Sequence, residues 1–225
     1  MQSRALAPHA VEILPQVATT DAQPDDAEPS AERQTELRAA YAANVAAGKP
    51  PYADVHIRTR GELLWVLRER GWSGEHDAYT VKYIIKPRGE SYEPANFSGV
   101  NLSHVCLRDV YLRIADLSGA NLVFADLRGA HLADANFSNA DMGRINLSAA
   151  ELRHANISGA HMREANLSGA NAHYSNLEYT RLHRANLKGT VLHGARMDPA
   201  TVLSDVTFDS HTWLGDVIWN GVSLA

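Results

Sequence analysis

Large apolar residues recur every five positions along much of this chain. In the segment ANISGAHMREANLSGA (155–170) they are Ile157, Met162 and Leu167, and each follows an alanine by two positions. An α-helix repeats every 3.6 residues and a β-strand every two, so neither produces a period of five. The pattern therefore predicts an element other than an ordinary helix or an open sheet.

The five-residue register runs without a slip from Phe97 to Met197, which makes 21 consecutive pentapeptides. The central residue is Leu in 14 of them, and Ala stands two positions earlier in 14, so the pattern is not chance. Tandem self-similarity of this kind predicts a solenoid, in which each repeat buries its apolar side against its neighbours. The core ladder expected inside it includes Leu102, Leu107, Leu112, Leu117, Leu122, Leu127, Leu132, Phe137, Leu147, Leu152, Leu167 and Leu187.

The five-residue register continues beyond Met197 if one extra residue is allowed at each of two places. One insertion near Asp198–Pro199 and another near His211 restore the period up to the C-terminal end of the sequence. The central residues are then Leu203, Phe208, Leu214, Trp219 and Leu224. This extension is the weaker part of the pattern, because Thr and Val replace Ala at the small position.

Each pentapeptide places two apolar side chains, two residues apart, on one side of a short extended segment. The small residue fits a narrow interior, and the large one stacks on its equivalent in the next coil. Burial of each Leu contributes about 1.5–3 kcal/mol, so a ladder of them can stabilise a chain whose aromatic content is only 7%. The Asn or Asp before each central residue is expected to bond to turn backbone, and glycines such as Gly159 suit tight corners.

The runs ADLSGANLVFADLRGAHLADANF (115–137) and ANISGAHMREANLSGAN (155–171) resemble the pentapeptide-repeat family, whose motif is A-(D/N)-L-x-x. The resemblance covers roughly 95–224. It implies an all-β solenoid, a right-handed quadrilateral β-helix with four pentapeptides per coil. About six coils are then expected, stacked at the strand spacing of about 4.8 Å. The resemblance also implies one possible partner, because some members mimic duplex DNA, bind DNA gyrase and protect it from quinolones.

The residues before the repeat predict a tail and a small cap. Residues 1–29 are rich in Ala, Pro and acid, which is typical of a disordered tail. A helix is expected over 30–48, with Ser30 as N-cap and Gly48 just beyond its end.

A β-α-β pattern follows this helix. The sequence predicts strands at Asp54–Arg58 and 79–86. Between them it predicts a helix over about 60–70, which begins with a capping box of Thr59 and Glu62 and ends at Gly71. The apolar residues of this second helix, Leu63, Leu64, Trp65 and Leu67, are expected to pack rather than to bind a partner. The predicted organisation is a tail (1–29), a helix plus β-α-β capping module (30–94) and a β-helix (95–225, with weaker register after 198).

Composition narrows the class of protein only a little. The net charge is −5, and the single cysteine, Cys106, excludes an intramolecular disulfide framework and a four-cysteine zinc site. Residues 1–29 contain no long apolar run, so neither a signal peptide nor a membrane span is expected. A cytoplasmic location follows as the expectation.

Residues twenty apart should form columns on the outer faces of the solenoid. One face collects positive side chains toward the C-terminal half and is the candidate partner face. An ordinary solvated face is the simpler interpretation, and a surface for an anion or an acidic protein is the alternative. The residues of the candidate partner face are Arg144, His161, Arg163, Arg181, His183 and Arg184.

Another face carries His131, Glu151, His154, His173, Tyr174 and His193, with His173 and His193 expected to be vertical neighbours. A metal site needs three or more convergent ligands, and flat solenoid faces converge poorly, so no metal is expected. The sequence contains no nucleophile elbow, P-loop or dinucleotide fingerprint. We therefore expect no enzyme and no cofactor.

Two functions from different classes are compatible with the sequence. The first is a scaffold that binds a protein through its rigid faces. The second is gyrase binding by DNA mimicry, which needs an acidic surface. Residues 95–199 hold ten Lys and Arg against nine Asp and Glu, a balance of +1 that counts against mimicry. Direct nucleic-acid binding needs a far larger basic excess and is not expected.

A further expectation concerns self-association. Val222 and Leu224 continue the repeat register, and an uncovered last coil would expose apolar surface and unpaired strand groups. End-to-end homodimerisation through the C-terminal coil is one of the ways to cover them. A terminal cap built from Trp213 and Trp219, or a longer parent repeat protein, are the others.

Overall fold

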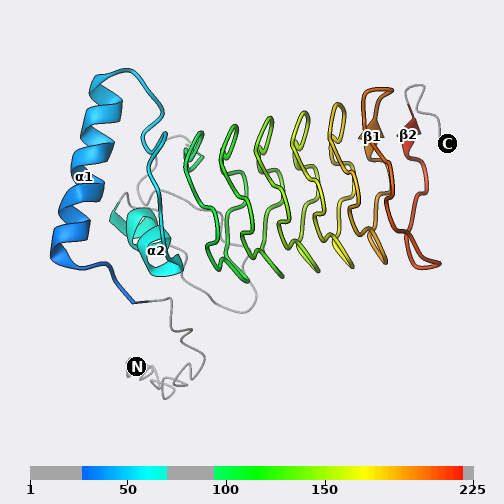
Figure 1. Ribbon diagram of the computed structural model, residues 1–225, viewed down its shortest axis with the longest axis horizontal. Helices are drawn as coiled ribbons and strands as arrows, with labels where there is room; N and C mark the ends of the chain where they lie inside the picture. Colours follow the sequence, from blue (N-terminus) through cyan, green and yellow to red (C-terminus); the bar gives the residue numbers. More distant parts are fainter. Residues whose placement is uncertain (1–26, 70–93, 220–225) are drawn as a thin grey trace, which may run out of the picture.

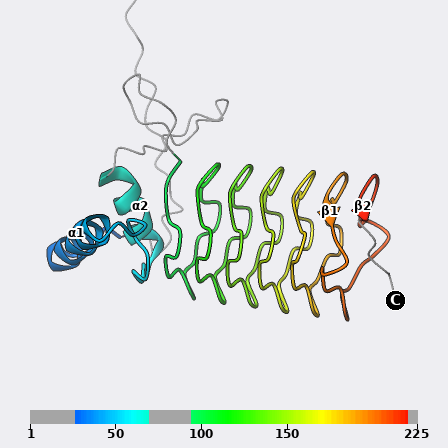
Figure 2. The same ribbon diagram turned by 90° about the horizontal axis from the view of Figure 1, so that it is seen from above.

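The computed structural model describes residues 27–69 and 94–219. They form a row of stacked coils with two helices at the N-terminal end of the stack, as Figures 1 and 2 show from two directions. The helices are α1 (Ala31–Ala46) and α2 (Arg60–Glu69), and the strands are β1 (Arg196–Met197) and β2 (Ile218–Trp219).

Neighbouring coils are joined by parallel bridges between residues twenty apart, for example Asn136 with Asn156 and Asn146 with Asn166. Four pentapeptides therefore carry the chain once around the stack. The hydrogen bonds run between coils: the N–H of Leu147 donates to the carbonyl oxygen of Asn166 at 2.7 Å. Each extended segment is so short that it contributes a single bridge, and only β1 and β2 reach two residues.

The interior is the ladder that the sequence predicts. All twelve core-ladder residues named above are buried, with at most 1% of their surface exposed. The small positions, such as Ala135 and Ala155, are buried beside them. Polar residues at small positions keep a hydrogen bond to a backbone carbonyl. For example, Thr180 donates from Oγ1 to the carbonyl of Ile157 at 3.1 Å, and Thr190 donates to that of Leu167 at 2.8 Å. These hydroxyls are therefore buried without being left unsatisfied.

The corners use left-handed backbone two residues after every central residue from Phe97 to Leu192. Gly159 has a φ of 70°, but Asn139 and Glu164 adopt the same conformation with φ of 57° and 58°. A side chain at 159 would also crowd the preceding coil, since an added Cβ would lie 2.5 Å from Oδ1 of Asn139 and the Asn139 side chain would have to shift. The glycine expected at the corners thus reflects close packing between coils as well as conformational freedom.

The two predicted insertions are confirmed by the register of the last coil. Arg181 pairs with Val202, an offset of 21, and Val191 pairs with Trp213, an offset of 22. Arg196 pairs with Ile218, where β1 and β2 run parallel. One extra residue has therefore entered before Val202 and another before Trp213.

Each insertion is accommodated by a short loop, and the two loops are of the same kind. Segments 198–201 and 209–212 both have the sequence Asp-x-x-Thr. In each loop the Asp carboxylate accepts from the Thr hydroxyl, at 2.8 Å and 3.1 Å respectively. It also accepts a backbone N–H of the preceding coil, from Tyr179 at 2.8 Å and from Gly189 at 2.9 Å. These bonds lower the pKa of both Asp side chains against the opposing effect of desolvation.

The two predicted N-terminal helices are confirmed. Ser30 caps α1 by accepting the N–H of Arg33 at 3.2 Å, and Gly48 follows the helix with a φ of 69°. Thr59 accepts the N–H of Glu62 at 3.1 Å to begin α2.

The predicted packing role of α2 is confirmed as well. Leu63, Trp65 and Leu67 are buried, and Leu64 is partly buried against the same core. The predicted strand at 79–86, Gly71 and most of the expected tail lie outside the described residues.

The segment around the first predicted strand belongs to the stack, which the sequence pattern did not reveal. Instead of a strand over Asp54–Arg58, there is one bridge, between His56 and Asn101 of the first coil. Tyr52 and Ile57, five residues apart, are buried in repeat register, and the ring centroid of Tyr52 lies 5.7 Å from that of Phe97. Two degenerate pentapeptides, centred on Tyr52 and Ile57, therefore belong to the stack although they precede residue 95. The sequence had predicted that the repeat begins at residue 95.

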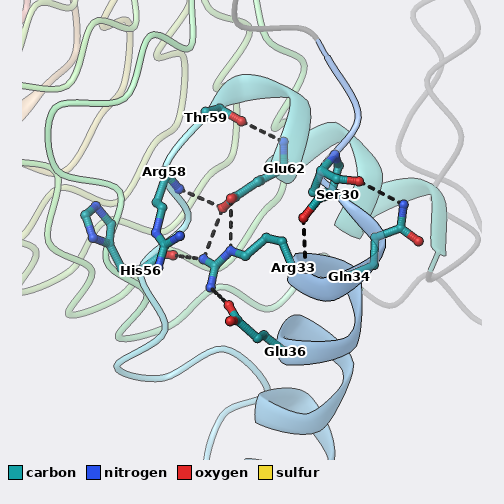
Figure 3. Close-up of polar contacts among 9 residues, drawn as sticks. Ser30, Arg33, Gln34, Glu36, His56, Arg58, Thr59 and Glu62 are labelled. Atoms are coloured by element: carbon teal, nitrogen blue, oxygen red, sulfur yellow. Dashed lines mark hydrogen bonds and ion pairs between the residues drawn. The ribbon is translucent and has the colours of Figure 1, made fainter.

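A largely buried ion pair joins this segment to both helices (Figure 3). Nε of Arg33, on α1, lies 2.9 Å from Oε1 of Glu62, on α2, and the guanidinium also donates to the carbonyl of His56. Oε2 of Glu62 accepts the N–H of Arg58 at 2.9 Å, and its side chain is only 7% exposed. The hydrogen bond with Glu62 raises the pKa of Arg33 despite burial. This network ties α1, α2 and the first layer of the stack together.

The core ladder generates the first prediction. Leu147→Ala removes a fully buried side chain from the middle of the stack and should lower the free energy of unfolding by about 2–5 kcal/mol. Urea titration followed by circular dichroism measures this change. The matched control is Ser148→Ala on the next residue, which should change stability by no more than about 0.5 kcal/mol. Equal losses in both variants would contradict the inward orientation of Leu147.

The Arg33–Glu62 ion pair generates the second prediction. Glu62→Gln leaves the guanidinium of Arg33 with only the more exposed Glu36, 2.8 Å away, as a charged partner. It should lower the free energy of unfolding by about 1.5–3 kcal/mol, the range for a hydrogen bond to a charged group. Glu69→Gln is the control, because Glu69 pairs with Arg38 of α1 at 2.9 Å but is 34% exposed. It should cost less than about 1 kcal/mol. Thermal unfolding measures both effects. Equal decreases in the midpoint temperature of the two variants would contradict the prediction.

Candidate functional site

The structure places all six residues of the candidate partner face on one wall of the stack. The bridges set His161 between Asp141 and Arg181 in a single column. The side chains come from three consecutive coils, and their positions are fixed by the buried ladder beneath them. We call this surface, made of Arg144, His161, Arg163, Arg181, His183 and Arg184, the basic wall.

Acidic neighbours neutralise part of the basic wall. Glu164 lies 2.8 Å from Nε of Arg144 and 3.2 Å from Nε of Arg163, and the bond from Arg144 is the main reason that the pKa of Glu164 is lowered. Asp205 lies 3.7 Å from Nε of Arg184. Four arginines stand against Asp141, Glu164 and Asp205, so the wall carries +1 with its histidines neutral. Within the described parts of the chain, Arg181 alone among the four has no ion-pair partner.

An aromatic residue that the sequence analysis did not single out lies at the edge of this wall. Phe124 is 45% exposed, and its ring stacks on His104 with centroids 5.0 Å apart. The guanidinium of Arg144 lies 5.4 Å from the centre of the same ring. The available signal was the twenty-residue spacing of His104, Phe124 and Arg144, which places them in one column.

Another wall gathers rings near the C-terminal end of the stack. His173 and His193 are vertical neighbours as predicted, with ring centroids 5.0 Å apart. Tyr174 lies 5.3 Å from His154 and 5.5 Å from His193, measured between centroids. Trp213 joins at 5.4 Å from His193, which the sequence reading missed. We call these five residues the ring cluster.

The surroundings of His173 disfavour its protonated form. Burial is the largest cause, and the neighbouring His193, Arg153 and His154 add to it, so the pKa of His173 is lowered. Among residues 27–69 and 94–219, no group of three His, Cys, Asp or Glu side chains is arranged to hold a metal ion. No helix in these ranges is long and apolar enough to cross a membrane.

The repeat region is similar to known proteins. A family model described as pentapeptide repeats matches eight copies, over residues 95–132, 130–169 and 165–200. No curated protein matches the chain.

Several solved structures are similar over part of their length. A pentapeptide repeat protein from the Arabidopsis thaliana thylakoid lumen shares 28% identity over 39% of this chain, with a TM-score of 0.34, and the chain spans 64% of it. One from Nostoc PCC 7120 shares 29% identity over 44% of this chain and 84% of its own, with a TM-score of 0.29. QnrB1, a plasmid-mediated fluoroquinolone resistance protein, shares 15% identity over 58% and 87%, with a TM-score of 0.28.

The lowered pKa of His173 generates a third prediction. Because the unfolded chain binds this proton more readily, the stabilising contribution of neutral His173 is fully present above pH 6.5 and is lost as pH falls through the folded pKa. The free energy of unfolding should therefore fall less between pH 7 and pH 5 in His173→Gln than in the unsubstituted protein. Titration of the imidazole by NMR gives a direct check, and a pKa of 6.5 or above would contradict the prediction.

Proposed function

Because residues 95–200 belong to the pentapeptide-repeat family, we propose that this protein is a non-catalytic scaffold that binds a protein partner through the faces of its repeat. In this proposal the repeat is a right-handed quadrilateral β-helix of about six coils, and the N-terminal helices cap one end of it. The partner binds the basic wall.

The observation that carries the proposal is the basic wall itself. Four arginines and two histidines project from three consecutive coils whose interior is buried, so the backbone positions that carry them are fixed before any partner arrives, and ion pairs with Glu164 and Asp205 hold three of the arginines. Pre-positioned side chains lose less conformational entropy on binding. Arginine is enriched at the energetic centres of protein interfaces, and Arg181 is exposed at the middle of this wall.

No specific observation on the described residues favours the alternative function, gyrase binding by DNA mimicry. A phosphate-like surface needs acidic side chains that are free of cations. Asp126 instead pairs with both Arg108 and Arg128, and Asp134 pairs with Arg113. Gyrase binding stays a prediction, which a supercoiling assay with ciprofloxacin and a titration of the protein would test.

Two other expectations from the sequence also stay predictions. Exposed apolar side chains on the last coil, Val202, Phe208 and Ile218, support an end-to-end homodimer through this coil. The cytoplasmic location rests on the sequence alone.

Charge reversal on the basic wall tests the proposed function. Full-length protein and the double variant Arg163→Glu, Arg181→Glu would be used as baits in extract of the source cells. A protein that binds the basic wall should be captured at least about tenfold less by the double variant, a loss of about 1.4 kcal/mol. Lys188→Glu, which reverses an exposed charge on the adjacent wall, is the matched control. Partners that bind both variants like the unsubstituted protein would exclude the basic wall as the binding surface.

A further inference from the structure

Two large aromatic side chains of the ring cluster remain half exposed. The exposed fraction is 55% for Trp213 and 51% for Tyr174, although both rings lie within a few ångströms of other rings. His173 lies between them, 5.6 Å from the centroid of Tyr174 and 5.9 Å from that of Trp213. The cluster thus presents a patch of adjacent rings on a wall other than the basic wall.

Two glycines allow these rings to lie against the coil. A Cβ added to Gly194 would meet Cε1 of Tyr174 at 2.3 Å and Cδ1 at 2.4 Å. A Cβ added to Gly215 would meet Nε1 of Trp213 at 2.4 Å and Cδ1 at 3.2 Å. Each ring therefore occupies the space that any other residue would fill at the neighbouring glycine. Even with these close contacts, about half of the surface of each residue stays exposed.

Hydrogen-bonding groups surround the rings. The hydroxyl of Tyr174 lies 3.3 Å from Nε2 of His193, whose Nδ1 is buried without a hydrogen-bond partner among the described residues. On the same wall, Glu151 accepts the side-chain amide of Asn171 at 3.0 Å and pairs with Arg153 at 3.4 Å. Rings and polar groups that can both donate and accept thus share one surface.

The charge on this surface is close to zero. Arg153 stands against Glu151 and Asp216, a balance of −1 with the three histidines neutral. Asp216 lies 3.5 Å from Nδ1 of His193. Phosphate-bearing ligands such as nucleotides need an excess of cations, which this balance does not provide. A stable protein interface buries about 800 Å² per partner, more than a patch centred on two side chains supplies.

We propose that the ring cluster is a binding platform for a neutral carbohydrate. The apolar C–H face of a pyranose ring stacks on exposed aromatic rings, and its hydroxyls both donate and accept hydrogen bonds. Tyr174 and Trp213 supply the stacking surfaces, and His173 and the hydroxyl of Tyr174 supply the polar contacts. The site lies on a different wall from the basic wall and does not depend on the proposed scaffold function.

Calorimetric titration of the full-length protein tests this assignment. The probes are five neutral hexasaccharides: cellohexaose, chitohexaose, mannohexaose, maltohexaose and laminarihexaose. At least one should bind with a Kd of about 1 mM or tighter, about −4 kcal/mol. Trp213→Ala and Tyr174→Ala should each weaken that binding at least about tenfold. Phe124→Ala, which removes an exposed ring from a different wall, should leave it unchanged.

A subtler variant separates ring orientation from ring presence. Gly215→Ala keeps every aromatic side chain but fills the space beneath the indole of Trp213, and the backbone at 215 is not in the left-handed region. It should weaken binding about as much as Trp213→Ala, while thermal unfolding shows that both variants remain folded. Three results would overturn the proposal: no binding of any hexasaccharide at about 5 mM, binding that survives in Trp213→Ala and Tyr174→Ala, or equal loss in Phe124→Ala. None of these results bears on the basic wall, whose charge-reversal test stands separately.

Discussion

The narrow interior of the coil stack accepts one small and one large side chain from each pentapeptide, and the other features of the structure follow from this fit. Small residues such as Ala135 let the walls approach, while central residues such as Leu147 stack on their equivalents and exclude water. Parallel hydrogen bonds between coils then satisfy the backbone, so the ladder and the bridges stabilise each other. Because every coil repeats the fit, outward positions are set at nearly constant spacing.

This division leaves function to the outward residues. The same ladder supports the arginines of the basic wall and, on another wall, the rings of Tyr174 and Trp213. Since the core dictates only two positions in five, neighbouring walls differ in chemistry without a change of fold. The acidic partners Glu164 and Asp205 reduce the charge of the basic wall while keeping its arginines in defined positions.

The ends of the repeat show how departures from the period are accommodated. At the N-terminal side, Tyr52 and Ile57 continue the interior with a degenerate pattern, and the Arg33–Glu62 pair attaches the helices to that layer. At the C-terminal side, two Asp-x-x-Thr loops each absorb one extra residue by bonding back to the preceding coil. The second of these loops shifts the register that brings Trp213 beside His193.

The sequence by itself determined the period, the inward residues, both helices and both insertions, because local spacing encodes which side chains face inward and which cap a helix. It also placed His173 above His193, since a constant twenty-residue offset makes columns predictable. Only the tertiary structure decided that residues 51–58 join the stack, because their spacing is too degenerate to recognise. It alone showed that Gly194 and Gly215 lie under aromatic rings and that Glu62 pairs with Arg33, since these contacts depend on side-chain conformation and not on periodicity.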